Sequence, residues 1–165
     1  QQLVDCDTSN YGCGGGWYSG AMKYFISSKA MTEGNYPYTA EQGACAYDAA
    51  KTFPLNTSGY NYLYNPDTIY TALKTGPVAV AVDANYTWYS YASGLYNGPC
   101  AASVNHAVTL VGYGNDADTG LGYFIIRNSW GTSWGESGHM RIVENTGNNN
   151  SCMIGRYGYT PKWAA

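Results

Sequence analysis

The chain has 165 residues and a mass of 17.8 kDa, enough for about one domain with its own hydrophobic core. Eight Lys and Arg stand against 11 Asp and Glu, and the net charge of −3 excludes the basic surface that nucleic acids or acidic membranes require. No apolar run reaches the roughly 18 residues of a spanning helix, and the chain opens on polar Gln1 and Gln2, so we expect neither a membrane segment nor a signal peptide.

The first part of the chain is poor in strand patterns. Behind a glycine cluster at 14–16, apolar residues recur at the spacing of one helix face and predict a helix over roughly 17–29. The residues of this face are Trp17, Ala21, Tyr24 and Phe25. Residues 30–64 carry no long pattern, and we expect loops there, held by Cys45.

A short helix is predicted at 66–74, followed by strands. Asn65 can cap this helix, Pro66 suits its first position, and Gly76 with Pro77 ends it. Alternating or continuous apolar residues then predict four strands, at 78–82, 107–112, 122–127 and 139–144. Strands joined by glycine-rich turns, without long helices between them, favour a mainly antiparallel sheet or barrel.

The cysteines number five, which is odd: Cys6, Cys13, Cys45, Cys100 and Cys152. They include no Cys-x-x-Cys pair and the two histidines lie far from most of them, so we expect no metal site. Acceptor tripeptides for N-glycosylation begin at Asn56, Asn85 and Asn149 and fit an oxidising compartment where disulfides persist. Two bridges leave one sulfur over, either free or bonded to a partner outside the sequence.

Each of the two histidines is a candidate general base. His106 stands at the start of an apolar strand, and Asn128 follows another strand, so the amide oxygen could orient one ring nitrogen while the other exchanges a proton. A hydrogen-bonded core histidine is the alternative for His106. His139 alternates with apolar residues of a strand and has no evident partner, so we expect a structural role for it.

Five sequence blocks, in this order, resemble the papain-like cysteine proteases of the cathepsin L type. The blocks are QQLVDCDTSNYGCGGGW, PVAVAVDA, GLYNGPC, VNHAVTLVGYG and YFIIRNSWGTSWGESGHMRI. The resemblance covers Gln1 to about Pro161 and implies an α+β fold of two lobes, one mainly helical and one an antiparallel β-barrel, with the active site in the cleft between them. We therefore expect 1–165 to be the carboxy-terminal portion of a papain-like peptidase domain, with 1–60 the remainder of the left lobe and 61–165 mainly the right-lobe barrel.

The resemblance implies a Cys/His/Asn mechanism, in which His106 serves the cysteine and Asn128 holds its ring. The family's nucleophile lies in a Cys-Gly-Ser/Ala-Cys-Trp/Tyr motif some 130 to 150 residues before the histidine, and this chain contains neither that motif nor the glutamine of the oxyanion hole. By resemblance Cys6 pairs with Cys45 and Cys100 with Cys152, whereas the partner of Cys13 is missing. We therefore expect an amino-terminally truncated enzyme that is inactive alone.

The resemblance also implies how a substrate is held. The backbone of Gly15 and Gly16 would pair with an extended peptide, and an apolar pocket would receive the residue before the scissile one. The pocket residues are Trp17, Tyr18, Ala81, Ala107 and, at the base, Tyr157. Trp130, which would cover the His106–Asn128 bond, and Asn105 complete the implied substrate-binding residues. An ordinary glycine turn and core packing of the tryptophan are the alternatives.

The expected function is a cysteine endopeptidase, because no histidine precedes His106 where papain-like carboxydipeptidases carry a paired-histidine loop. Its expected partners are peptide or protein substrates, with a propeptide or cystatin-like inhibitors, and no nucleic acid or membrane. We expect no cofactor and a lysosomal, vacuolar or secreted location. The alternative is a protease-derived pseudoenzyme or binding module that has lost its nucleophile.

Overall fold

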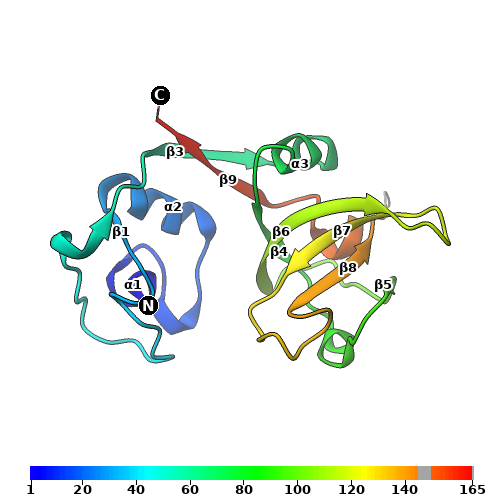
Figure 1. Ribbon diagram of the computed structural model, residues 1–165, viewed down its shortest axis with the longest axis horizontal. Coiled ribbons are helices and arrows are strands. Elements are labelled where there is room, and N and C mark those ends of the chain that lie inside the picture. Colours follow the sequence, from blue (N-terminus) through cyan, green and yellow to red (C-terminus); the bar gives the residue numbers. More distant parts are fainter. Residues whose placement is uncertain (145–149, 165) are drawn as a thin grey trace. The chain divides into compact units, whose positions relative to one another are not determined.

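A computed structural model describes residues 1–144 and 150–164. The chain divides into two compact units, one of Gln1–Asn61 with Pro161–Ala165 and the other of Tyr62–Thr160 (Figure 1). We call them unit 1 and unit 2 and describe each by itself. The glycosylation acceptor at Asn149 lies outside the described residues.

Unit 1 holds short elements joined by long loops. They are α1 (Gln2–Cys6), η1 (Gly12–Gly14), α2 (Tyr18–Ser27), β1 (Ala30–Met31), η2 (Ala49–Lys51) and β2 (Thr52–Phe53), with β1 and β2 antiparallel. The helix predicted at 17–29 is α2, whereas α1 was not predicted because five residues are too few to show a helical period.

Buried polar contacts hold unit 1 together. The side chain of Gln2, 6% exposed, donates from Nε2 to the carbonyl of Lys29 at 2.9 Å and accepts at Oε1 from the N–H of Met31 at 2.8 Å. A disulfide joins Cys6 at the end of α1 to Cys45 in the long loop. These contacts connect α1 to residues 29–31 and to the loop that carries Cys45.

Unit 2 contains most of a seven-stranded sheet. Its elements are α3 (Pro66–Leu73), β4 (Val78–Val82), η3 (Tyr86–Ser90), β5 (Leu95–Tyr96), β6 (His106–Asn115), β7 (Gly122–Arg127), β8 (His139–Val143) and α4 (Asn150–Met153). The chain passes between the units through β3 (Thr57–Leu63) and β9 (Gly158–Trp163), and the strand order is β3-β9-β4-β6-β7-β8-β5. All four predicted strands are present, and each end lies within three residues of its expected position. Together with the helices they confirm the α+β class.

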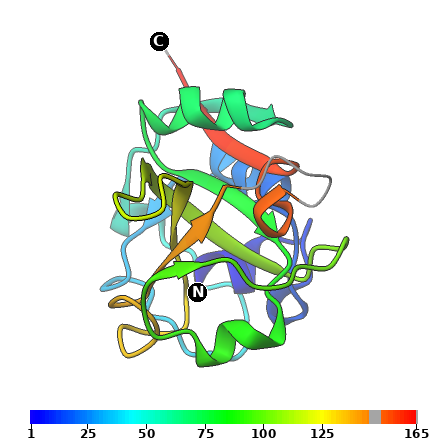
Figure 2. The same ribbon diagram turned by 90° about the vertical axis from the view of Figure 1, so that its right-hand side faces the viewer.

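The core of unit 2 lies against β4, β6 and β7. Val78, Val80 and Val82 are fully buried, because alternate residues of a strand point to one face. α3 lies against β6 and β4 (Figures 1 and 2). Its predicted cap is present, since the Asn65 side chain accepts from the N–H of Thr68 at 2.9 Å.

One expectation about the strands was wrong. Residues 57–63, expected to be loop, form β3, whose tyrosines alternate with small polar residues and so lack a clear apolar signal. The sheet is mainly antiparallel, as expected, and among the described pairings β5 alone pairs in parallel, with β8. β5 is only two residues long, and its direction follows from the loop that leads to it rather than from any sequence period.

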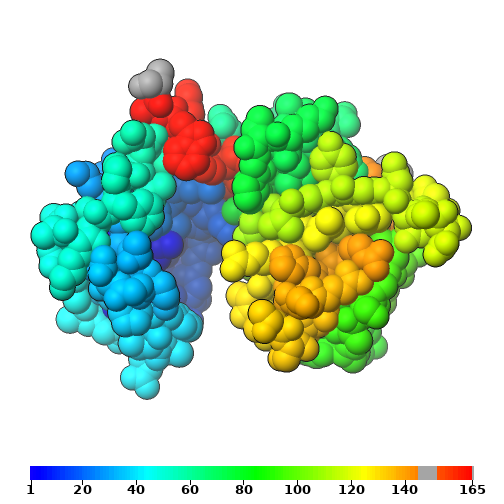
Figure 3. Space-filling view, in the orientation of Figure 1, coloured from blue at the N-terminus to red at the C-terminus, as the bar shows by residue number. Residues whose placement is uncertain are grey.

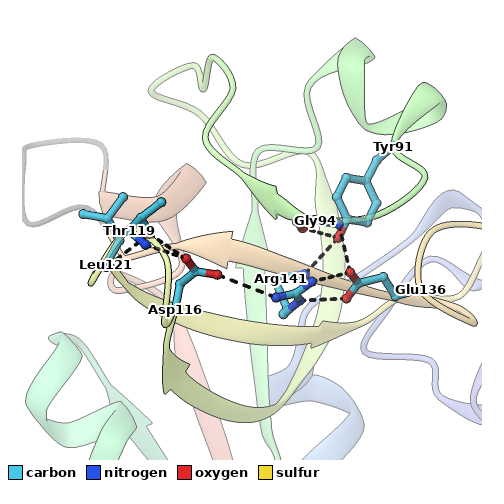
Figure 4. Close-up of polar contacts among 7 residues, drawn as sticks. All are labelled: Tyr91, Gly94, Asp116, Thr119, Leu121, Glu136 and Arg141. Atoms are coloured by element: carbon cyan, nitrogen blue, oxygen red, sulfur yellow. Dashed lines mark hydrogen bonds and ion pairs between the residues drawn. The ribbon is translucent and has the colours of Figure 1, made fainter.

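An ion-pair network ties the connection between β7 and β8 to the sheet (Figure 4). Arg141 on β8 donates to both carboxylate oxygens of Glu136, from Nη2 at 2.8 Å and from Nε at 3.0 Å. Glu136 also accepts from the N–H of Gly94 at 2.9 Å, and Asp116 lies 3.9 Å from Arg141. The hydrogen bonds from Arg141 lower the pKa of the Glu136 carboxyl.

Within the described residues no helix has the length and apolar character needed to cross a membrane. The same residues include no group of three or more His, Cys, Asp or Glu side chains that could hold a metal ion.

Candidate active site

His106 and Asn128 meet at one edge of the sheet of unit 2. His106 is the first residue of β6, and Asn128 directly follows β7. Because β6 and β7 are antiparallel neighbours, the start of one strand lies beside the end of the other. The separation of 22 positions between the two residues is thus spanned by a single pair of strands.

The ring and the amide are hydrogen-bonded. His106 Nε2 lies 2.9 Å from Asn128 Oδ1, which also accepts from the N–H of Ser129 at 2.8 Å. An amide oxygen can only accept, so Nε2 carries the proton and Nδ1 is left to exchange one. This arrangement suits a base held in one tautomer.

The loop after β7 holds Asn128 through its backbone. The N–H of Asn128 donates to the carbonyl of Gly138 at 3.0 Å. Gly131 and Gly138 both have φ of +86°, and a Cβ added at Gly138 would lie 3.3 Å from the carbonyl oxygen of Gly131. Glycine is needed at both positions because this left-handed backbone disfavours any side chain. In the space-filling view the segment between β7 and β8 lies on the surface (Figure 3).

Several aromatic rings pack together on the His106 side chain. Trp130 stacks on the His106 ring with centroids 5.2 Å apart, and Tyr89 stacks on Trp130 at 4.9 Å and 10°. Trp134 meets the edge of Trp130 and donates to the carbonyl of Trp88 at 2.7 Å. Sequence reasoning missed Tyr89, which is 74% exposed and carries no motif signal.

Asn128 Nδ2 is buried and finds no hydrogen-bond partner among the described residues. Such an unmet donor costs roughly 1 to 3 kcal/mol. The oxygen of the Asn128 amide therefore accepts two hydrogen bonds while its nitrogen has none in the described part of the chain, and the unpaired nitrogen lowers the stability of the fold.

Four of the sequence-predicted site residues lie in unit 1. Gly15, Gly16, Trp17 and Tyr18 line a hollow of about 190 Å³ together with apolar side chains that include Leu3 and Ala21. Gly15 has φ of +96° and, like Gly16, is exposed. The N–H of Gly15 donates to the carbonyl of Gly12 and its carbonyl accepts from the N–H of Tyr11, so the backbone of Gly15 is already hydrogen-bonded within the unit.

The remaining predicted residues lie in unit 2. Ala81 of β4 pairs with Ala107 of β6, and its N–H donates to the carbonyl of Tyr157 at 3.1 Å, so these three lie together. Asn105 precedes His106 and accepts from the N–H of Ala84 at 2.8 Å. His139 Nδ1 lies 3.0 Å from the carbonyl oxygen of Ser137.

Four of the five cysteines are bonded. Besides Cys6–Cys45, a second disulfide joins Cys100 to Cys152. Cys13 is a free, exposed thiol whose Sγ lies 3.9 Å from the carbonyl of Ala40. The two bridges are those that the resemblance implies.

A larger hollow, of about 510 Å³, lies in unit 1 and contains none of the predicted site residues. Its wall includes Asp5, which accepts from the N–H of Gly43 and the hydroxyl of Tyr36, both at 2.8 Å. These bonds, the one from Gly43 first, lower the pKa of Asp5. Because these hydrogen bonds satisfy the Asp5 carboxylate within unit 1, we assign no catalytic role to it.

Comparison with known proteins supports the resemblance along the chain. The model of the papain family cysteine proteases matches residues 1–162. Fruit bromelain of Ananas comosus is 43% identical over 148 residues, which are 87% of this chain and 41% of that protein. The chain thus spans less than half the length of this curated relative.

Solved structures share the fold. Bromelain from Ananas comosus in complex with the inhibitor E64 superposes with a TM-score of 0.88 at 38% identity, covering 99% of this chain and 77% of that one. A recombinant stem bromelain precursor gives 0.92 at 37% identity, covering 100% of this chain and 55% of the precursor. The family match, the identities and the shared fold establish that this chain belongs to the papain family of cysteine proteases.

Proposed function

We propose that this chain supplies the base and the orienting amide of a cysteine endopeptidase. The observation that carries the proposal is the 2.9 Å bond between His106 Nε2 and Asn128 Oδ1 beneath the stacked ring of Trp130. In the complete enzyme, Nδ1 of His106 would take the proton of a cysteine thiol, and the thiolate would attack the peptide carbonyl. The imidazolium would then protonate the leaving amine.

The nucleophile of this reaction is proposed to lie outside these 165 residues. Four cysteines form disulfides, and Cys13 does not lie in the sequence motif of a papain-like nucleophile. The chain alone should therefore not hydrolyse peptides. A pseudoenzyme or binding module remains the second candidate, favoured by this lack of a nucleophile among the cysteines present.

One experiment separates the two candidates. The coding sequence upstream of Gln1 is determined, and the complete protein is assayed with a fluorogenic peptide and with E64, the inhibitor bound to the bromelain relative. A Cys-Gly-x-Cys-Trp motif with turnover that E64 abolishes supports the protease. Serine or glycine in place of that cysteine, with no turnover, supports the binding module.

We further propose that the pocket for the residue before the scissile one accepts apolar side chains. The residues that the resemblance implies for this pocket carry no charge, and arginine would want a carboxylate at the base. They are Trp17, Tyr18, Ala81, Ala107 and Tyr157. Peptides with phenylalanine or valine at that position should be cleaved with a higher kcat/KM than peptides with arginine. Preference for arginine would contradict this assignment.

The domain boundary, partners and location are proposals of the same kind. We propose that 1–60 is the remainder of the left lobe and 61–165 mainly the right-lobe barrel of the peptidase domain. Protein substrates, a propeptide and cystatin-like inhibitors are the proposed partners, and two of the similar solved structures are described as a precursor and an inhibitor complex. A lysosomal, vacuolar or secreted location fits the two disulfides.

A further inference from the structure

We propose that Asp83 is a positioning residue of this site, whose carboxylate holds the segment that leads into His106. The inference rests on the proposed function and adds to it a residue that does not touch the ring itself. Asp83 directly follows β4 and is 4% exposed. In the adjacent register pair, Val82 of β4 faces His106 of β6, so the carboxylate lies one residue from the pairing that sets the histidine backbone.

Residues outside the segment 101–105 are needed to fix its position. It contains no helix or strand, and four of its five residues are exposed. Asp83 contacts it twice: one carboxylate oxygen accepts from the N–H of Ala101, and the other accepts from Asn105 Nδ2 at 3.2 Å. The carboxylate thus spans both ends of the segment.

Asn105 returns the contact to the strand that carries Asp83. Its Oδ1 accepts from the N–H of Ala84 at 2.8 Å, and its own N–H donates to the carbonyl of Val82 at 2.9 Å. Asp83 and Asn105 therefore form a reciprocal pair in which each side chain holds the other's stretch of backbone. The residue next in the chain is His106.

Asp83 is itself anchored. Its N–H donates to the carbonyl of Cys152 at 2.9 Å, and Cys152 is bonded to Cys100, where the segment begins. None of the ion pairs among the described residues includes Asp83, and both of its carboxylate oxygens accept from N–H donors. A buried carboxylate held in this way is expensive to misplace, which makes it a stiff reference point for the segment.

The chemistry depends on that stiffness. A displacement of about 1 Å in a reacting group can cost about 100-fold in rate. If the segment shifts, His106 moves relative to Asn128, and the bond that fixes the tautomer lengthens. We therefore expect Asp83 to act on kcat through the His106–Asn128 bond.

The test is an exchange of the two side chains in the complete enzyme. In Asp83→Asn a side-chain NH₂ faces another donor, and in Asn105→Asp two carboxylates face each other. In the double variant Asp83→Asn with Asn105→Asp, the new amide donates to the new carboxylate, which still accepts from the N–H of Ala84. We expect each single variant to lose about 10-fold or more in kcat with a smaller change in KM, and the exchange to recover a large part of the loss.

Two further measurements distinguish positioning from simple stability. The NMR resonance of the His106 Nε2 proton, assigned by its loss in His106→Ala, should broaden or shift in Asp83→Asn and return in the exchange variant. In a plot of kcat/KM against pH, the acidic and basic limbs should shift together with this resonance. Asp118→Asn is the control, since Asp118 is an exposed carboxyl in the turn between β6 and β7 and should leave both readouts unchanged.

The outcomes are separable. An unchanged Nε2 proton resonance and unchanged kcat in a folded Asp83→Asn variant overturn the positioning role, as does a loss that the exchange does not recover. The resonance can be read whether or not the protein turns over substrate. If it responds to Asp83→Asn while the complete wild-type protein hydrolyses no peptide, the positioning stands and the proposed function fails.

Discussion

His106 owes its proposed reactivity to the side chains around it rather than to its own chemistry. The oxygen of Asn128 lies at hydrogen-bond distance from Nε2, and Trp130 stacks on the imidazole ring. Removing the base should leave the fold intact, because His106 is half-buried at the edge of the sheet. Removing Asn128 should leave the ring free to rotate.

The first prediction concerns these two residues in the complete enzyme. His106→Ala should lower kcat by about 100-fold to 10,000-fold, the range that general acid–base catalysis supplies. Asn128→Ala should lose less, because the base is retained but is no longer oriented. Peptide hydrolysis under saturating substrate checks both, with His139→Ala as the control. Full activity of His106→Ala would rule out its assigned role.

A second prediction at this scale concerns Asn56 and Asn85. Asn56 is exposed beside β3, whereas Asn85 is half-buried and its side chain accepts from the N–H and hydroxyl of Thr87, capping η3. In a host that N-glycosylates secreted proteins, we expect glycan at Asn56 before Asn85. Mass spectrometry of the protein before and after enzymatic glycan removal measures occupancy, with Asn56→Gln as the matched variant. Glycan on Asn85 alone would contradict the argument from exposure.

At the scale of elements, the connection between β7 and β8 helps to determine the position of the proposed site. It carries Asn128 and Trp130 at one end and is fastened at the other by the Glu136–Arg141 pair (Figure 4). The pKa of Glu136 is lowered by Arg141 and that of Asp116 by Thr119. Both carboxyls therefore release their protons more readily in the folded chain than in the unfolded one.

The third prediction is the resulting pH dependence. Because the folded pKa values are depressed, the stability that these groups supply is complete above the ordinary carboxyl range near pH 4 and is lost as pH falls through the folded values. Glu136→Gln should lower the free energy of unfolding by about 1 to 3 kcal/mol at pH 7 and by less at pH 3. Urea denaturation at both pH values measures this.

Asp118→Asn serves as the control for that experiment, since Asp118 is an exposed carboxyl in the same unit. Its stability should follow that of the unchanged protein at both pH values. A Glu136→Gln penalty that is equal at pH 7 and pH 3 would show that the pair contributes through packing and not through charge.

At the scale of the whole molecule, covalent bridges replace part of the core that short elements cannot supply. Cys6–Cys45 closes a separation of 39 residues within unit 1, and Cys100–Cys152 closes 52 within unit 2. The second bridge also begins the segment that ends at His106. Its loss should therefore affect both stability and the proposed site.

The fourth prediction follows from this difference. The double variant Cys100→Ser with Cys152→Ser should lose about 2 to 4 kcal/mol of unfolding free energy. It should also loosen the His106–Asn128 bond, whereas Cys6→Ser with Cys45→Ser should cost similar stability without that effect. Thermal unfolding and the Nε2 proton resonance of His106 distinguish the two. An equal change of the resonance in both variants would show that the effect is not local.

Local sequence was sufficient wherever one element carried its own signal. Asn65 and Pro66 marked α3 as well as its cap, and the valines of β4 alternated as a half-buried strand does. It failed for β3 and for the two-residue β5, since neither has an apolar period and both depend on the strands beside them. The family could be read from ordered motifs because these keep their spacing in the chain.

Only the tertiary structure decided which atoms meet. The motifs placed His106 and Asn128 in the same site by resemblance, but the 2.9 Å bond, the choice of Nε2 and the stack of Tyr89 on Trp130 follow from the pairing of β6 with β7. The role proposed for Asp83 had no signal in the sequence, where it reads as the polar end of a strand. Its contacts join residues that lie about 20 and 70 positions apart in the chain, and such distances close only when the sheet forms.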